Sequence, residues 1–537
     1  MTVRGTNPPP AASSASAISP GLSPRQASSA LYHVLILIAA TFLARVVFAS
    51  SLGLGIDESY TVATARHPQL SQFDHPPAAW WLVWGASQLF ATERALPLRL
   101  PFIALFALTT WLMFRLTTRL FDERAGLWAA VTLNFAPVLA WTSGTWILPD
   151  GPLNAALVAG ANAAAAALFG VRSAAPLWWL ATGACAGLAL LSKFHGAFLL
   201  AGIGLFLVTV PAHRRWLATP WPYAALLVAM AVCLPVIVWN AQHDWMALAF
   251  QGGRAHFRGI DPWGLLAALA GEALYLLPWV WLPLVFCLVK AVARGPAEDR
   301  GWMVACLAIG PIVAFVVVAL TGTRVLYHWA APGYLMLFPL LGAEVAAAIA
   351  NHSRYVRPWL IATATSLAVV LATVVLMAEL PMPAIALPRG KNVPYPLWES
   401  LDWKDLATEL EARGLLATPG LFITATRWHE AGKIDYALGG KVPVMCLCRD
   451  PRGYGVLTRP DEHLGENALI VGRALSPERA AAEYGRYFET IEQMSPIAIT
   501  HAGRPAFELS VYLGHGLRTS TGTPNLLDPL SLRSVRR

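Results

Sequence analysis

Acidic, basic and imidazole side chains gather in a few short polar segments of an otherwise apolar chain. Two carboxylates stand side by side in Gly55-Ile56-Asp57-Glu58-Ser59-Tyr60, and Phe73-Asp74-His75-Pro76-Pro77 follows in the same segment. A carboxylate can accept a proton from a hydroxyl group, and a cation or an imidazole can stabilise negative charge on a phosphate. Side chains of these types recur at Asp150, Lys193, His195, His243, Arg254, Arg258 and His328.

Long apolar segments must position these side chains. Of the 537 residues, 56% are hydrophobic and 13% are charged, about half the charged fraction of a soluble protein, and the mean hydropathy is +0.52. The segments are continuously apolar over about 20 residues, unlike the alternating strands of a membrane barrel. The sequence excludes a cytosolic enzyme and predicts an all-α polytopic membrane protein with about eleven spans, near 31–54, 98–119, 126–143, 153–171, 177–192, 196–212, 219–239, 264–289, 302–321, 331–350 and 358–379.

The basic residues between the spans predict the orientation of the chain in a cell inner membrane. With the N-terminus in the cytoplasm, the Lys- and Arg-rich segments fall on the cytoplasmic side, as the positive-inside rule requires. The net charge of +8 is therefore assigned to orientation and lipid contacts, since no basic cluster with interleaved aromatic residues predicts nucleic-acid binding. The periplasmic side then receives 55–97, 144–152, 193–195, 240–263, 322–330 and everything after 380.

Residues 77–90 are apolar over a length that is short for a span, and they are expected to lie in the membrane interface. If this segment crossed the membrane, every later side assignment would invert. The composition predicts four parts along the chain: a disordered cytoplasmic N-terminus at 1–29, a transmembrane domain at 30–380, a small periplasmic α/β domain at 381–515 and a flexible tail at 516–537.

The candidate side chains also have purely structural alternatives. Asp57 and Asp150 could cap the helices that follow them, Asp74 and His75 could belong to a turn, and Lys193 could extend toward lipid headgroups. Cys446 and Cys448 are expected to be neighbours on one face of a strand without a disulfide, because only one residue separates them.

The order of the motifs carries a resemblance to a known family. The Asp57-Glu58 pair, His75-Pro76-Pro77, Leu148-Pro149-Asp150 and Leu191-Ser192-Lys193-Phe194-His195-Gly196 resemble the integral-membrane C-type glycosyltransferases (glycosyltransferase family 39-like). The resemblance is closer to the bacterial branch of the dolichyl-phosphate-mannose protein mannosyltransferase family, which includes the lipid A aminoarabinose transferases. Segments 239–245, 328–334 and 437–447 are similar to later parts of that branch, so the similarity covers roughly residues 30 to 515.

The resemblance implies a C-type glycosyltransferase fold and transfer of a sugar from a polyprenyl-phosphate donor to an acceptor outside the cytoplasm, with inversion at the anomeric carbon. It implies that Asp57 is the catalytic carboxylate, Glu58 its neighbour and Asp150 a second acidic residue of the cavity. His75 stands where the aminoarabinose transferases have Lys, as in the protein mannosyltransferases. The sugar therefore stays open, as does the acceptor, which could be a cell-envelope lipid, another glycan or a protein.

The residue types suit this chemistry independently. A carboxylate such as Asp57 can take the proton of an acceptor hydroxyl, and cations held in place beforehand stabilise a leaving phosphate. The candidates for contact with the donor phosphate are Lys193, His75, Arg254 and Arg258, and further candidates for the substrate cavity are Tyr60, Asp74, His195, His243 and His328. No cofactor is assigned and no metal ligands are defined, although a divalent metal stays open.

Two other classes of function remain as alternatives. A polytopic transporter or lipid flippase also has many spans and charged groups in the membrane, but such proteins commonly carry internal repeats with broken helices at matching positions. The sequence has no such repeat, and its predicted odd number of spans and appended soluble domain also favour a transferase. A structural or assembly subunit is the other alternative.

Overall fold

The computed structural model describes residues 24–254, 257–380, 385–386, 392–393 and 398–518. The predicted disordered segment at 1–29 lies outside the described residues up to residue 23, and helix α1 begins at Pro24. Most of the predicted tail at 516–537 also lies outside them, and strand β8 continues to Leu517.

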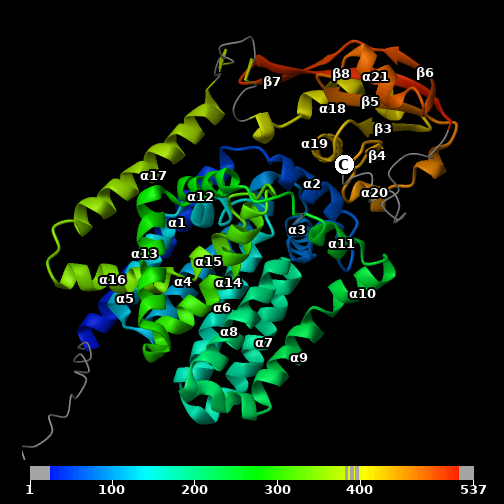
Figure 1. Cartoon of the computed structure of the whole chain (residues 1–537). Helices are drawn as coiled ribbons and strands as arrows, with labels where there is room; N and C mark the ends of the chain where they lie inside the picture. Colours follow the sequence, from blue (N-terminus) through cyan, green and yellow to red (C-terminus); the bar gives the residue numbers. More distant parts are fainter. Residues whose placement is uncertain (1–23, 255–256, 381–384, 387–391, 394–397, 519–537) are drawn as a thin grey trace, which may run out of the picture.

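Helices form the part of the chain before residue 380 (Figure 1). The α-helices are α1 (Pro24–Ser50), α2 (Ile56–Ala65), α3 (Ala78–Phe90), α4 (Ala95–Leu120), α5 (Glu123–Asn134), α6 (Asp150–Phe169), α7 (Ala175–Ser192), α8 (Ala197–Thr209), α9 (Trp221–Val232), α10 (Leu234–Gln242), α11 (Met246–Gly252), α12 (Pro262–Leu276), α13 (Pro278–Arg294), α14 (Asp299–Leu320), α15 (Ala331–Leu335), α16 (Phe338–Ala350) and α17 (Val356–Glu379). A π-helical turn, η1 (Val138–Thr142), and the 3-10 turns η2 (Arg172–Ala174), η3 (Phe194–Gly196), η4 (Pro211–Ala218) and η5 (Gly295–Ala297) join them.

Eight helices among the described residues are long and apolar enough to cross a membrane, or up to ten if each bent helix pair is one span. The protein is therefore a multi-pass membrane protein, although the predicted count of eleven spans is not confirmed. The difference arises where proline interrupts apolar segments, because proline cannot continue the hydrogen bonding of a helix. Segment 126–143 divides into α5 and η1 around Pro137, and segment 264–289 divides into α12 and α13 at Pro278.

Helix α6 lies at the centre of the helical region, and small residues let its neighbours approach closely. The sequence of α6 is rich in alanine, and 83% of its most apolar 18-residue stretch is buried inside the protein. A Cβ atom added to Gly160 would lie 2.4 Å from Leu199 of α8, and one added to Gly183 of α7 would lie 2.2 Å from the backbone oxygen of Ala225 in α9. Such close packing replaces hydrophobic burial as the force that holds helices together in a bilayer.

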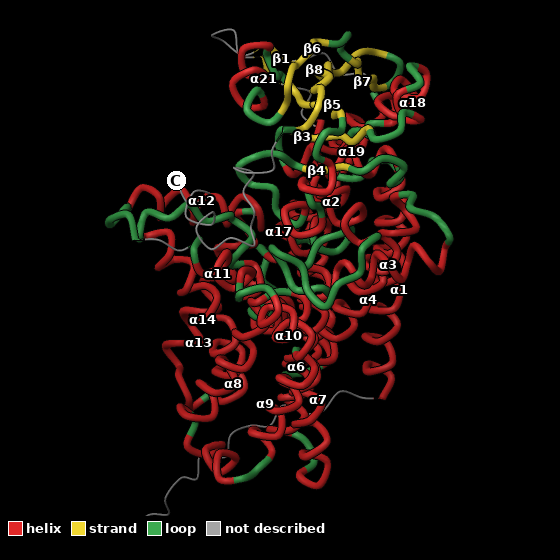
Figure 2. The backbone as a smooth tube through the Cα atoms, turned by 90° about the vertical axis from the view of Figure 1, so that its right-hand side faces the viewer, coloured by secondary structure: helices red, strands yellow, loops and turns green. Residues whose placement is uncertain are grey.

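The C-terminal region, defined here as residues 398–518, contains a mixed sheet at one end of the helices in both views (Figures 1 and 2). The strand order is β4-β3-β5-β8-β6, with β7 also paired to β8; β3 runs parallel to β4 and β5, and β8 runs antiparallel to β5, β6 and β7. Its elements are η6 (Trp398–Ser400), α18 (Lys404–Ala412), η7 (Leu415–Ala417), β3 (Leu421–Ala425), α19 (Trp428–Leu438), β4 (Val444–Met445), α20 (Tyr454–Leu457), η8 (Pro460–His463), β5 (Asn467–Arg473), α21 (Pro477–Tyr484), β6 (Phe488–Gln493), β7 (Ile497–His501) and β8 (Arg504–Leu517). The short strands β1 (Ile385–Ala386) and β2 (Asn392–Val393) precede it.

Helix α19 joins the C-terminal region to the helical region by packing on α2. A Cβ atom added to Gly432 would lie 2.7 Å from Cα of Tyr60, so only glycine permits this approach. The buried ammonium group of Lys433 donates hydrogen bonds to the backbone oxygens of Leu54 and Leu401. Two regions far apart in sequence therefore share one buried interface.

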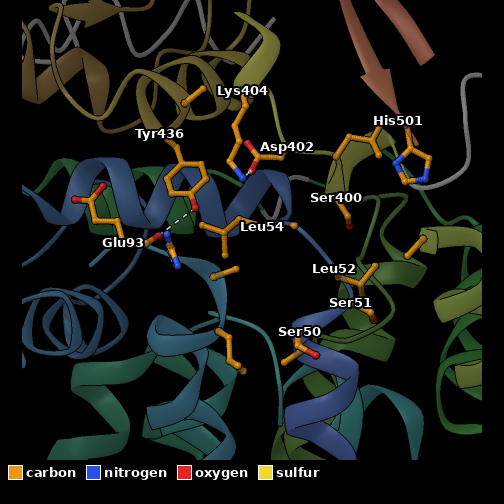
Figure 3. A pocket seen from close by; sticks show the side chains of 18 of the residues that line it. Ser50, Ser51, Leu52, Leu54, Glu93, Ser400, Asp402, Lys404, Tyr436 and His501 are labelled. Carbon is orange, nitrogen blue, oxygen red and sulfur yellow. Dashed lines mark hydrogen bonds and ion pairs between the residues drawn. The ribbon is translucent and has the colours of Figure 1, made fainter. Parts of the chain in front are cut away.

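An open cavity of about 740 Å³ lies beside this interface and is bordered by the ends of α1 and α4 and by the C-terminal region. Figure 3 shows Tyr436 pointing toward Glu93, whose backbone oxygen accepts a hydrogen bond of 3.0 Å from the tyrosine hydroxyl. Lys404 and Asp402 form an ion pair on another wall.

One expectation from the sequence is wrong. Cys446 and Cys448 form a disulfide, although a single residue separates them. Their Cα atoms lie 5.2 Å apart, within the usual range for a disulfide. The chain leaves the regular strand β4 after Met445, which brings the two sulfur atoms to the same side.

Candidate active site

Most of the predicted site residues line one cavity of about 400 Å³ between the helical and C-terminal regions. Its walls come from α2, the 74–80 segment, the η1–α6 segment, the end of α7 and the segment before α15. The predicted residues in its lining are Asp57, Tyr60, Asp74, His75, Asp150, Lys193, Arg254 and His328.

Asp57 points into this cavity without a partner. It is the second residue of α2, whose N-cap is Gly55, so Asp57 is not the cap of that helix. Within the described part of the chain, its carboxylate makes no hydrogen bond or ion pair, and its side chain is exposed to the open space of the cavity. Although its surface is open to the cavity, the protein around Asp57 limits the hydration of the carboxylate and raises its pKa to about 6, while Arg452 acts in the opposite direction and Asp74 adds to the rise.

Glu58 follows Asp57 in the chain but lies outside the cavity lining. Its oxygens accept hydrogen bonds of 2.8 and 2.5 Å from Arg99 of α4, and both side chains are almost fully buried. Burial alone would raise the pKa of Glu58, but the Arg99 guanidinium holds it below its usual value. Glu58 also accepts from the backbone N–H groups of Gly55 and Ile147, so it ties the start of α2 to the segment before α6.

Asp150 and Lys193 form a buried ion pair across the cavity wall. The Lys193 ammonium lies 3.0 and 3.1 Å from the two oxygens of Asp150. Asp150 makes no side-chain cap at the start of α6, and Lys193 is only 5% exposed. The structure therefore excludes the alternatives in which Asp150 serves as a helix cap and Lys193 extends to lipid headgroups.

The turn that carries Lys193 requires a glycine. Lys193 ends α7 with an extended backbone, and η3 follows at once. A Cβ atom added to Gly196 would lie 2.5 Å from the backbone of Ala189, so a larger residue would push η3 away from α7. The Lys-Phe-His-Gly segment is therefore a tight turn that directs Lys193 inward.

A π-helical turn forms another wall of the cavity, with Val138 and Thr142 in its lining. Arg45 of α1 holds this turn by donating hydrogen bonds of 2.8 Å to the backbone oxygen of Ala140 and 2.9 Å to Oδ1 of Asn134. Its guanidinium also lies 4.9 Å from the ring centre of Trp141. The buried Arg45 guanidinium thus holds the η1 turn in place, although this part of the cavity wall has no charged side chain of its own.

Asp74 lies in a hydrogen-bonded network that includes the C-terminal region. It accepts a hydrogen bond of 3.2 Å from the Tyr60 hydroxyl and forms an ion pair of 3.2 Å with Arg452. The backbone N–H of Gly453 donates to the Tyr60 oxygen at 2.8 Å. Arg452 and Trp428 both line the cavity, so the C-terminal region supplies part of its wall.

Two imidazoles of the cavity are neutral near pH 7. Burial lowers the pKa values of His75 and His328 to about 4, more strongly than the neighbouring Asp carboxylates raise them. A neutral imidazole carries one N–H donor and one acceptor nitrogen. Both histidines can therefore bind an oxygen atom without adding a charge.

A second cavity, of about 240 Å³, shares His75, Lys193, Arg254 and Trp329 with the first. Its other walls are largely aromatic or aliphatic and include Phe194, Phe198, Phe315 and Val318. His195 lines this second cavity, and its ring stacks on Phe315 with centroids 5.1 Å apart. The shared cations thus stand between a polar space and an apolar space.

Two predicted residues do not join this cluster. Arg258 is exposed and outside both cavity linings, and its backbone N–H donates to Thr321. His243 stacks on Trp239 with centroids 4.1 Å apart, and its Nδ1 lies 2.8 Å from the Trp239 oxygen. Arg452 and Trp428 were missed by the sequence prediction, and no local motif marks them, because Arg452 lies 378 positions after the aspartate it contacts.

The described residues contain no group of three or more His, Cys, Asp or Glu side chains that could hold a metal ion. Asp57 and Asp150 do line one cavity, but Asp150 is already paired with Lys193. The cationic side chains of this cavity come from Lys193, Arg254 and Arg452.

Part of the chain is similar to known proteins. Residues 74–239 match the sequence model of the family described as dolichyl-phosphate-mannose-protein mannosyltransferase. The lipid A galacturonosyltransferase RgtD of Rhizobium johnstonii is 23% identical over 283 residues, which are 52% of this chain and 58% of that relative. The match thus spans little more than half of the relative's length. The resemblance inferred from the motifs is confirmed by these matches.

Solved structures share the overall architecture. ArnT from Cupriavidus metallidurans bound to undecaprenyl phosphate aligns with a TM-score of 0.59 and 16% identity, over 89% of this chain and 97% of ArnT. The Archaeoglobus fulgidus oligosaccharyltransferase aligns with a TM-score of 0.50 and 12% identity, over 88% of this chain and 74% of that one. The chain therefore has the C-type glycosyltransferase fold of these membrane proteins.

Replacing Asp57 and replacing Glu58, the neighbouring carboxylates of α2, should have different effects on the stability of the protein. Glu58→Gln weakens a fully buried ion pair, so we expect a loss of roughly 3–5 kcal/mol in the free energy of unfolding. Asp57→Asn removes an unpaired carboxylate and should leave stability unchanged or slightly higher. Thermal unfolding in lipid nanodiscs, followed by tryptophan fluorescence, measures both, with the exposed Glu462→Gln as the matched control. Equal melting temperatures for Glu58→Gln and Asp57→Asn would contradict the assignment of Glu58 to a stabilising buried ion pair and of Asp57 to an unpaired carboxylate.

Proposed function

We propose that the protein is an integral-membrane glycosyltransferase that moves a sugar from a polyprenyl-phosphate donor to a cell-envelope acceptor by a single displacement with inversion. The observation that carries the proposal is the cavity in which the unpaired Asp57 carboxylate faces the same space as Lys193 and Arg254. The adjoining apolar cavity, which shares those two cations, suits the first isoprene units of a lipid chain.

The proposed reaction assigns a separate task to each side of the cavity. The acceptor oxygen attacks the anomeric carbon while the bond between that carbon and the phosphate oxygen breaks. The proton of the acceptor hydroxyl goes to Asp57, and the electron pair of the broken bond stays on the phosphate. Since the pKa of Asp57 is about 6, it is ionised at neutral pH yet basic enough to accept a proton.

Lys193 and Arg254 are proposed to hold the donor phosphate and to stabilise the charge that develops on it. Arg254 lies over the rings of Phe250 and Trp329, at 5.2 Å from each centroid, and has no carboxylate partner among the described residues. Lys193 is balanced by Asp150 and points into both cavities. Neutral His75 and His328 can donate further hydrogen bonds to the phosphate or the sugar.

Glu58 is proposed to support the site rather than to react, because Arg99 and two backbone N–H groups occupy its oxygens. His195 is proposed to line the lipid side. Arg258 and His243, which lie outside the two cavity linings, receive no role in transfer. The transporter or flippase alternative is less well supported, since both the matching family and the relative carry transferase names.

The general test of the proposal is transfer by the purified protein. Undecaprenyl phosphate linked to radiolabelled mannose, galacturonic acid or aminoarabinose is supplied singly with a membrane fraction as the acceptor. Label should move from one of these donors into lipid, glycan or protein. Export of intact donor across a vesicle membrane without cleavage would favour the flippase alternative.

Asp57→Asn should abolish transfer, since an amide keeps the shape of the side chain but cannot accept a proton. The wild-type kcat/KM for the donor should fall as the pH decreases through about 6, because protonation of Asp57 removes the base. Asp461→Asn, at an exposed position in η8, is the matched control and should retain full activity. Near-normal turnover by Asp57→Asn would remove Asp57 from the role of base.

Lys193→Ala and Arg254→Ala should each weaken undecaprenyl phosphate binding by at least about tenfold, equivalent to 1.4 kcal/mol. Loss of one partner from a partly desolvated charge pair costs more than loss of an exposed one. Arg324→Ala, which removes an exposed cation, should bind normally. Binding is measured by intrinsic fluorescence titration in detergent. If Arg254→Ala and Lys193→Ala both bind like the wild type, another group holds the phosphate.

The orientation proposed for the chain puts both cavities and the C-terminal region in the periplasm. The basic turn η4 contains Arg214 and Arg215 and belongs to the end of the helices assigned to the cytoplasm. A cysteine that replaces the exposed Arg258 should react with a membrane-impermeant thiol reagent in intact spheroplasts, and one that replaces Arg214 should react only after lysis. The reverse pattern would invert the proposed topology.

A further inference from the structure

Arg452 brings a charge from the C-terminal region into the cavity formed mainly by the helices. It lies in the segment between the Cys446–Cys448 disulfide and α20, and its side chain is 15% exposed. The guanidinium forms ion pairs with Asp74 at 3.2 Å and with Asp450 at 3.1 Å. One cation thus joins the 74–80 segment to the C-terminal region.

Two aromatic rings hold the Arg452 guanidinium in place. It lies 4.7 Å from the ring centre of Trp428 in α19 and 5.1 Å from that of Phe250 in α11. The next residue, Gly453, donates its backbone N–H to Tyr60, and a Cβ atom there would lie 2.5 Å from the Tyr60 oxygen. The cation is therefore fixed by α2, α11 and α19 together.

The two arginines of the cavity differ in how their charges are balanced. Arg452 pairs with two carboxylates, whereas the Arg254 guanidinium donates a hydrogen bond to the amide oxygen of Gln251. A guanidinium already paired with two carboxylates has little remaining attraction for a phosphate. Arg254 is thus better suited to the donor phosphate, and Arg452 is left for another task.

The unpaired Asp57 lines the same cavity as Arg452. The charged groups that act on Asp57 are Arg452, Asp74, Glu58 and Glu399. After burial, which raises the pKa of Asp57, the largest influence is Arg452, which lowers it, while the three carboxylates raise it further. Arg452 is therefore the group that opposes protonation of Asp57.

We propose that Arg452 is a positioning residue of the transfer reaction, which holds Asp74 in the cavity wall and places a positive charge in the cavity that the proposed base, Asp57, lines. The C-terminal region then belongs to the active site, because it supplies the positive charge of Arg452. Without this charge, the Asp57 base would stay protonated up to a higher pH. This inference rests on the proposed function and extends it to a residue 395 positions away along the chain.

The test is the pH dependence of kcat/KM for the undecaprenyl-phosphate sugar that the wild-type protein transfers. A base is active only when deprotonated, so activity falls as the pH decreases through its pKa. Removing the positive charge in Arg452→Gln should move this fall to higher pH by at least about half a unit. Asp74→Asn removes a negative charge and should move it to lower pH. Arg452→Lys keeps the charge and should stay near the wild-type position.

Two controls distinguish this shift of the pH profile from a general loss of folding or substrate binding. Arg459→Gln makes the same change at an exposed ion pair of the C-terminal region and should not move the profile. Arg452→Gln should bind undecaprenyl phosphate within about twofold of the wild type, because the proposed phosphate ligands are elsewhere. If Arg452→Gln does not fold, the shift to lower pH expected for Asp74→Asn, with Arg452→Lys near the wild-type position, still decides the matter.

The outcomes distinguish this inference from the proposed function. No transfer by the wild type from any donor would refute the function itself. Transfer by the wild type with superimposable pH profiles for all three variants would refute only the role of Arg452. Weaker undecaprenyl phosphate binding by Arg452→Gln, by tenfold or more with an unmoved profile, would also refute it and make Arg452 a phosphate ligand.

Discussion

The buried pair between Glu58 and Arg99 is the contact on which the arrangement of the site depends. Every N–H of the Arg99 guanidinium has an acceptor, since the group bonds Glu58 and the backbone oxygens of Ala49, Leu52 and Gly53. Glu58 in turn accepts from Ile147. This one pair joins the end of α1, the start of α2, α4 and the segment before α6. Asp57 precedes Glu58, so its direction into the cavity follows from the fixed position of its neighbour.

The charges around the cavity fall into paired and unpaired groups, and this division gives the site its chemistry. Asp150 and Lys193 balance each other, as do Asp74 and Arg452, and both pairs are largely removed from solvent. Asp57 and Arg254 have no partner of opposite charge among the described residues. A substrate with a hydroxyl group and a phosphate would provide both missing interactions. The paired groups set the geometry, the unpaired groups are left for the substrate, and Lys193, although paired with Asp150, also reaches both cavities and so can contact the phosphate.

The sequence predicted those parts of the site that adjoin helix ends. Asp57, Asp74 and Asp150 lie soon after or just before long apolar segments, and the charge bias between the segments assigned them to one side of the membrane. The sequence could not predict that Lys193 turns inward, because this depends on the close approach of Gly196 to Ala189. The resemblance made Asp57 the catalytic carboxylate and Glu58 its neighbour, but spacing and composition could not show that Arg99 occupies the oxygens of Glu58. The contribution of Arg452 depends on how α19 packs on α2, which no local pattern indicates.

The spans were predicted less well than the residues between them. Apolar composition alone does not distinguish a continuous helix from two helices broken at proline, as at Pro137 and Pro278. These breaks have a function in the fold, because the turn after Pro137 forms a cavity wall that Arg45 holds in place. Regular transmembrane helices therefore supply the scaffold, and the interruptions shape the space between them.

The most direct test of the proposed phosphate site is an experimental structure of the protein in a lipid nanodisc with undecaprenyl phosphate. We expect the phosphate to lie within hydrogen-bond distance of Lys193 and Arg254, with the lipid chain beside Phe198 and Phe315 and the Asp57 carboxylate open toward the acceptor side. A phosphate bound in the cavity of about 740 Å³ beside Tyr436 and Asp402, with Lys193 and Arg254 free, would contradict it.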